Sequence, residues 1–230
     1  MAFLVNRRSL VATVASCLAM SRPARAKSEQ AFDIATADGA PIRNFRIAPG
    51  KAPSDLPGVI RFGPPKAELI LYEFFDYACP YCRVASQELD ILLGPDAGAK
   101  LGLLQHPILS PRSAEVARVM LAATLLHGDA VAYRLHVGFF QAPGPVGAEK
   151  ALTVAAGLEL NAGRLAEEAA REEVAAILAV QTERARALSL PQTPSFVLGD
   201  FAFVGWPGVE PTESFIEATR RCGGLRCSSP

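Results

Sequence analysis

An excess of positive charge is absent from this 230-residue sequence, because 23 lysines and arginines balance 23 aspartates and glutamates. Basic residues are adjacent in pairs at most, so the basic stripe of a nucleic-acid-binding surface is missing and we expect no nucleic-acid partner. The three histidines, His106, His127 and His136, do not have metal-ligand spacing, and there is no Met-rich or His-rich tract. We therefore expect neither a bound metal nor another cofactor.

Long apolar stretches are also lacking. Beyond the N-terminus no segment stays apolar for the eighteen or so residues that a membrane-spanning helix needs. No internal repeat or low-complexity tract is present. The length suits one globular domain with an inserted subdomain, and such a chain can bury its own core.

The first 26 residues have the features of an export signal. Arg7 and Arg8 give a positive start, residues 10–20 are apolar, and Ala24-Arg25-Ala26 is a small-x-small cleavage site. A buried N-terminal helix is the alternative. The paired arginines also resemble a twin-arginine signal, and Cys17 with the residues before it resembles a lipoprotein processing site, which we rank below simple cleavage. We expect the mature chain to be soluble and periplasmic, in an oxidising compartment where disulfides persist.

Apolar runs and turn signals predict an alternation of strands and helices. Strands are predicted near residues 42–47, 59–62, 68–75, 101–104, 195–198 and 201–204. Helices are predicted between Cys82 and Gly94-Pro95, and near residues 113–127, 130–140, 148–157, 164–188 and 211–221. This order predicts an α/β chain in which a helical block interrupts the strands.

These elements give the following predicted organisation. It consists of a signal peptide (1–26), an N-terminal arm (27–58), a first α/β part (59–112), a helical insertion (113–190), a second α/β part (191–222) and a C-terminal tail (223–230).

The four cysteines after the signal form two close pairs, Cys79/Cys82 and Cys222/Cys227. Together they could form a four-thiolate zinc site, although the C-x4-C spacing of the second pair is a poor match. We therefore interpret the pairs separately. For Cys222 and Cys227 we expect a structural disulfide, with a second redox pair or a metal clip as alternatives.

Cys79 and Cys82 lie where a dense apolar strand passes into a helix. Pro80 suits the first helical turn, since its missing N–H has no partner there. Cys79 then lies beside free backbone N–H groups at the positive helix end, which favours a thiolate and lowers its pKa. Cys82, three residues on, can close a small disulfide and resolve a mixed one. A purely structural disulfide or a metal site would use the same spacing.

Two further residues point to the same chemistry. Glu73 interrupts an otherwise apolar strand six residues before Cys79, and a buried carboxyl there could exchange a proton with Cys82. The alternative is that Glu73 faces solvent. Pro194 opens a predicted core strand, which is unusual unless its N–H is not required, and a cis peptide bond would fit.

Three segments together resemble the DsbA-like thiol oxidoreductases of the thioredoxin-like superfamily. They are F-F-D-Y-A-C-P-Y-C (74–82), H-P-I-L (106–109) and T-P-S-F-V-L-G-D (193–200), with a helical stretch before the third. The branch with an F-D-Y-x-C-P-Y-C site is the most similar, and it includes copper-tolerance relatives. The resemblance implies a thioredoxin-like fold with an inserted α-helical subdomain.

The resemblance also implies roles for individual residues. Cys79 would be the nucleophile and Cys82 the resolving thiol, with Glu73 as the buried acid. Pro194 would be the cis-proline facing the cysteines, and the backbone of Thr193 would pair with an extended substrate peptide. The dipeptide Pro80-Tyr81 departs from the Pro-His of the best-known oxidase, and because tyrosine carries no positive charge we expect a less oxidising site.

The implied function is disulfide formation or exchange in reduced or misoxidised exported proteins, with a membrane redox partner that restores the pair. A disulfide isomerase or reductase, or a copper(I)-binding protein that uses the two thiolates, is the alternative. The sequence does not fix the direction of electron flow.

Overall fold

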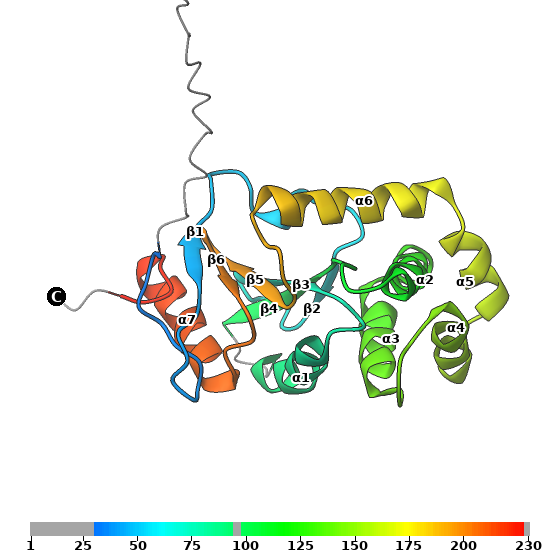
Figure 1. Cartoon of the computed structure of the whole chain (residues 1–230), viewed down its shortest axis with the longest axis horizontal. Helices are drawn as coiled ribbons and strands as arrows, with labels where there is room; N and C mark the ends of the chain where they lie inside the picture. The colour runs from blue at the N-terminus through cyan, green and yellow to red at the C-terminus, as the bar shows by residue number, and fades with distance from the viewer. Residues whose placement is uncertain (1–29, 94–97, 228–230) are drawn as a thin grey trace, which may run out of the picture.

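The computed structural model describes residues 30–93 and 98–227 (Figure 1). The predicted export signal, including Cys17, and the last three residues of the predicted tail lie outside the described residues. Within the described part, no helix has both the length and the apolar character needed to cross a membrane.

Six strands form one sheet in the order β1-β6-β5-β3-β4-β2. Strands β3 and β4 are parallel, and the other neighbouring pairs are antiparallel. The strands are β1 (Asn44–Arg46), β2 (Ile60–Phe62), β3 (Leu69–Phe75), β4 (Ala99–Gln105), β5 (Ser195–Leu198) and β6 (Phe201–Val204). The last two coincide with the predicted hairpin.

Helices cover both faces of the sheet and extend beyond one side of it (Figure 1). They are α1 (Pro80–Leu89), α2 (Pro111–His127), α3 (Asp129–Gln141), α4 (Ala148–Gly157), α5 (Ala162–Ala169), α6 (Glu172–Ala187) and α7 (Val209–Cys222). Short 3-10 turns occupy Pro53–Asp55 and Asp90–Leu93.

Strand β3 lies in the middle of the sheet and is buried on both faces. Leu71 and Phe75 pack into the larger core with α1, α3 and α7, whereas Tyr72 and Phe74 pack into a second core on the α6 side. This explains its continuous apolar sequence, since both faces of the strand meet helices. Glu73 has the same parity as Leu71 and Phe75, so it belongs to the α1 side.

Two helical predictions need correction. The single helix predicted over 164–188 is divided into α5 and α6, because Arg171 adopts an extended backbone between them. Helix α2 begins at Pro111, before the predicted start at residue 113. There the hydroxyl of Ser110 accepts a hydrogen bond from the Ser113 backbone N–H at 3.1 Å, and Pro111 occupies the first helical position.

Candidate active site

Cys79 lies at the start of α1, in the turn that follows β3. Its backbone is extended, so it caps the helix, and its N–H donates to the carbonyl of Asp76 at 3.0 Å. Pro80 and Tyr81 at its side are exposed, Tyr81 to 68%, whereas Cys79 itself is 4% exposed. Both thiols of the pair are free in this structure.

The two thiols differ strongly in environment. The pKa of Cys79 is lowered to about 6, first by a hydrogen bond from the Cys82 thiol and further by the Thr193 side chain and the first backbone N–H groups of α1, against the effect of burial. Cys82 is completely buried, and burial raises its pKa well above the usual range. The arrangement provides a thiolate at Cys79 and a thiol at Cys82 at neutral pH.

The loop before β5 lies against Cys79. The Thr193–Pro194 peptide bond is cis, and the Cys79 thiol donates to the carbonyl of Thr193 at 3.2 Å. The Pro194 carbonyl in turn accepts a hydrogen bond from Gly205 N–H at 2.9 Å. The hydroxyl of Thr193 is buried and has no hydrogen-bond partner among the described residues. This leaves it available to a thiolate at Cys79.

Glu73 is buried beneath the cysteine pair. It is 1% exposed, so the alternative in which it faces solvent is wrong. Neither carboxyl oxygen has a hydrogen-bond partner in the part of the chain that the structure describes. Burial, with a smaller contribution from charge on Cys79, raises the pKa of Glu73 to about 8. The carboxyl is therefore mainly protonated at neutral pH and can give up a proton.

Asp76 is a site residue that the sequence analysis did not identify. It is 1% exposed, and its carboxylate accepts backbone hydrogen bonds from Ala78 at 2.7 Å and from Ile108 and Leu109 at 2.8 Å each. It thus joins the Cys79 turn to the loop that contains the H-P-I-L segment. A buried carboxylate with three N–H donors is a strong positioning group.

The two histidines next to the site, His106 and His136, are buried, and burial favours their neutral form. The Tyr77 hydroxyl lies 3.2 Å from Nδ1 of His136, and burial lowers the pKa of His136 to about 3. His106 lies 3.2 Å from the carbonyl of Leu190 through Nε2, and burial lowers its pKa as well. Neither supplies a positive charge to the cysteines near neutral pH.

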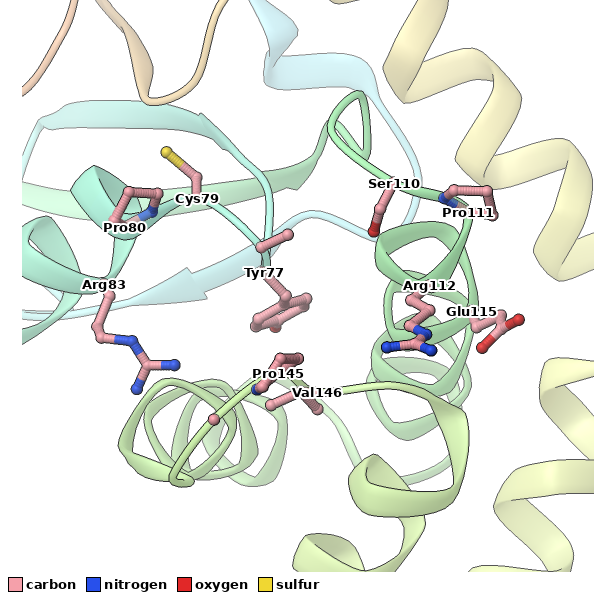
Figure 2. A pocket seen from close by; sticks show the side chains of 12 residues that line it. Tyr77, Cys79, Pro80, Arg83, Ser110, Pro111, Arg112, Glu115, Pro145 and Val146 are labelled. Atoms are coloured by element: carbon pink, nitrogen blue, oxygen red, sulfur yellow. The ribbon is translucent and has the colours of Figure 1, made fainter.

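Two clefts meet at Cys79 and Pro80. The first, of about 500 Å³, runs along the cis-proline loop, and its lining includes Tyr81, Ile108, Leu109, Thr193, Pro194 and Trp206. The second, of about 740 Å³, lies between the starts of α1 and α2 and the loop before α4 (Figure 2). We call them the proline cleft and the arginine cleft, since Arg83 and Arg112 line the second.

Cys222 and Cys227 lie apart from this site and form a disulfide at the end of α7. The loop that they close carries the buried Leu225, and Arg226 donates to the carbonyl of Asp33 at 2.9 Å. The pair therefore holds the chain end against the N-terminal arm. Among the described residues, no group of three or more His, Cys, Asp or Glu side chains is arranged to hold a metal ion.

Comparisons with known sequences and structures find thioredoxin-like proteins. The sequence profile of the thioredoxin family matches residues 55–218. A thioredoxin-like oxidoreductase from Silicibacter pomeroyi DSS-3 is 28% identical, with a TM-score of 0.67 over 72% of this chain and 94% of that one. No curated protein matches the chain.

Two further solved structures share the fold at lower identity. The thiol-disulfide exchange protein α-DsbA2 from Wolbachia pipientis is 19% identical, with a TM-score of 0.60 over 71% of this chain and 84% of that one. The catalytic domain of Proteus mirabilis ScsC is 20% identical, with a TM-score of 0.60 over 71% and 89%. These likenesses confirm the predicted α/β fold, a thioredoxin-like sheet with a helical insertion.

Proposed function

Since this chain belongs to the thioredoxin family, as a DsbA-like thiol-disulfide oxidoreductase, we propose that it forms or exchanges disulfides in exported proteins through Cys79 and Cys82. The observation that carries this proposal is the contrast between the two thiols. Cys79 has a pKa of about 6 at a helix start, and Cys82 is buried with a raised pKa. The Cys79 sulfur is therefore suited to act as nucleophile and leaving group, whereas the Cys82 sulfur is suited to hold a proton.

The proposed reaction begins with the Cys79–Cys82 disulfide. A substrate thiolate attacks Sγ of Cys79, a mixed disulfide forms, and Cys82 departs with the electron pair of the broken bond. Because the pKa of Cys82 is high, its sulfur takes a proton at once, and the neutral carboxyl of Glu73 is the proposed donor.

A second substrate thiolate then attacks the substrate sulfur of the mixed disulfide. Cys79 departs as a stable thiolate, the substrate leaves as a disulfide, and two electrons have passed to the cysteine pair. The reverse sequence reduces a disulfide, so the same residues serve exchange and isomerisation.

Substrate binding is proposed for the proline cleft. The backbone of Thr193 borders Cys79 and would pair with an extended substrate strand. Tyr81, Ile108 and Leu109 expose 68%, 41% and 52% of their surface around it. An apolar rim of this kind suits unfolded chains, whose apolar side chains are still accessible.

We place this function in the periplasm, with a membrane redox partner that reoxidises or reduces the pair. The N-terminal sequence features support export. A solved structure with the same fold, 19% identical, is described as a periplasmic thioredoxin-like protein from Salmonella enterica serovar Typhimurium.

The proposal is tested by the redox potential of the Cys79–Cys82 pair. The native chain is equilibrated in glutathione buffers, and peptide mapping after alkylation separates this pair from Cys222–Cys227. Because Tyr81 has no positive charge, we expect a value between roughly −270 mV, as in thioredoxin, and about −120 mV, as in DsbA. A value at the lower end would indicate a reductase, an isomerase or a copper(I)-holding dithiol. If no reversible disulfide formed, the proposal would fail.

A further inference from the structure

The arginine cleft opens on the side of Cys79 that faces the helical insertion (Figure 2). Tyr77, Pro145 and Val146 form apolar parts of its lining. At about 740 Å³ it falls within the size range of pockets that bind small ligands or several peptide residues. The reaction proposed above uses Cys79 in its wall but assigns no other part of this space.

Cationic groups lie on opposite sides of this cleft. Figure 2 shows the side chains of Arg83 and Arg112 on either side of Tyr77, from α1 and α2. Arg83 donates to the carbonyls of Phe140 and Ala142, so its guanidinium is held in place by the end of α3. The ammonium of Lys150 donates to the carbonyl of Pro143, the residue before Gly144, which lines the cleft.

Among the described residues that line the cleft, Glu115, one turn after Arg112, is the only acidic one. Among the described residues, no carboxylate lies within ion-pair distance of Arg83 or Arg112. Arg112 is also exposed and stands in the first turn of α2, where a positive charge opposes the helix dipole. The positive charge of Arg112 is thus not neutralised by a described carboxylate, and it does not stabilise the helix. An acidic ligand would be attracted to it.

The two clefts share Cys79 and Pro80, so one extended chain can occupy both. A peptide whose cysteine reacts at Cys79 and whose one side pairs with Thr193 would continue into the arginine cleft on its other side. Arg83 follows Cys79 by one turn of α1, and it lines the same cleft as Arg112. Residues that flank the reacting cysteine would therefore lie beside these two arginines.

We propose that the arginine cleft is a substrate subsite for acidic residues that flank the reacting cysteine. This proposal rests on the proposed disulfide exchange, and it adds a preference for substrates with negative charge beside the cysteine. Arg112 is the specificity-determining residue, because no carboxylate among the described residues pairs with its guanidinium, and Arg83 adds positive charge from the opposite wall.

The test uses the full chain in its oxidised form and two synthetic dithiol peptides. They have the same sequence with two cysteines, one with glutamates beside the cysteines and one with glutamines. In each reaction the peptide thiols become a disulfide and the Cys79–Cys82 disulfide becomes two thiols. Glutamates raise the pKa of neighbouring thiols, so each second-order rate is expressed per peptide thiolate, with the thiol pKa of each peptide measured separately. We expect the glutamate peptide to react roughly two- to fivefold faster, the contribution of about one exposed ion pair. Salt should reduce this ratio.

Arg112→Glu should reverse the ratio, and Arg112→Gln should bring it close to one. Either change suits the first turn of a helix, so folding should be retained. Arg164→Glu is the matched control, because Arg164 is an exposed arginine in the first turn of α5 outside both clefts. If the native chain oxidised both peptides at equal rates, or if Arg112→Glu left the ratio of the two rates unchanged, the proposed subsite would be overturned. If neither peptide were oxidised, the proposed function itself would fail.

Discussion

The thiol of Cys79 donates a hydrogen bond to the backbone carbonyl of Thr193, over 3.2 Å and across 114 residues of sequence. This contact ties the start of α1 to the loop before β5, so the nucleophile and the proposed strand-pairing backbone lie side by side. The Cys79 thiolate no longer donates this bond, and the carbonyl then becomes available to a substrate N–H. Loss of the Cys79 proton, by ionisation or by formation of the Cys79–Cys82 disulfide, and substrate binding are therefore coupled at one atom.

The first prediction concerns the ionisation of Cys79. With the pair reduced, the rate of alkylation of Cys79 by iodoacetamide should rise with pH, with a midpoint near its pKa of about 6, and then level off. Because the Cys82 thiol is the largest cause of the lowered pKa, Cys82→Ala should move the midpoint upward. Thr193→Val should move it in the same direction, since it removes the hydroxyl. A midpoint unaffected by Cys82→Ala would contradict this account.

The second prediction concerns Asp76. Asp76→Asn replaces one acceptor oxygen by an NH2 group that faces backbone N–H donors, so at least one buried donor is left without a partner. We expect the free energy of unfolding in urea to fall by about 2–4 kcal/mol. Disulfide exchange should slow as well, since the Cys79 turn loses its tie to the loop at Ile108.

The control for this substitution is Asp200→Asn. The Asp200 carboxylate is likewise hydrogen-bonded, here to Arg46 at 3.2 Å, but both side chains are more than half exposed. Such a pair contributes little, so stability should change by less than about 0.5 kcal/mol. Equal effects of the two substitutions would show that burial of Asp76 has no energetic consequence.

The sequence predicts the regular parts of this fold well. The hairpin of β5 and β6 is marked by two short apolar runs on either side of Gly199-Asp200, and its bounds agree with the structure. The break between α5 and α6 is not marked, because no glycine or proline occurs there and alanine-rich sequence favours helix throughout. Both helices pack against α2, so tertiary packing fixes the break.

Some residues of the candidate site can likewise be predicted from the sequence, and others cannot. Cys79, Cys82 and Pro194 are identified by local sequence, since strand, turn and helix signals surround them. Asp76 is not, because two of its three donors come from residues 108 and 109, and only the folded chain brings them together. The arginine cleft is missed for the same reason, as its walls come from three separate segments.

The third prediction concerns Cys222 and Cys227. Replacing both by serine should lower the free energy of unfolding by roughly 2 kcal/mol, the scale expected for a short closed loop. Proteolysis near Asp33 should become faster, because Arg226 and Leu225 would no longer be held against the N-terminal arm. The exchange rate at Cys79 should not change. A slower rate would instead assign these cysteines to the redox reaction.

The last prediction concerns Glu73, whose pKa is raised from 4.5 to about 8 by burial. A carboxyl with a raised pKa in the folded state contributes stability that is fully present below pH 4.5 and is lost as pH rises through about 8. The glutamine side chain of Glu73→Gln cannot ionise. Between about pH 5 and about pH 9 the free energy of unfolding of the native chain should therefore fall by a few kcal/mol relative to that of the variant, at roughly 1.4 kcal/mol per pKa unit.

Unfolding in urea across this pH range, with both proteins in the same redox state, measures the difference. Glu68→Gln is the control, because Glu68 lies just before the same strand but is exposed, and this variant should follow the native chain at every pH. Glu73→Gln should also slow the departure of Cys82 during exchange, since the amide has no proton to give. If the variant kept both the native pH dependence of stability and the native exchange rate, Glu73 would be a packing residue, and the proton for Cys82 would come from another source.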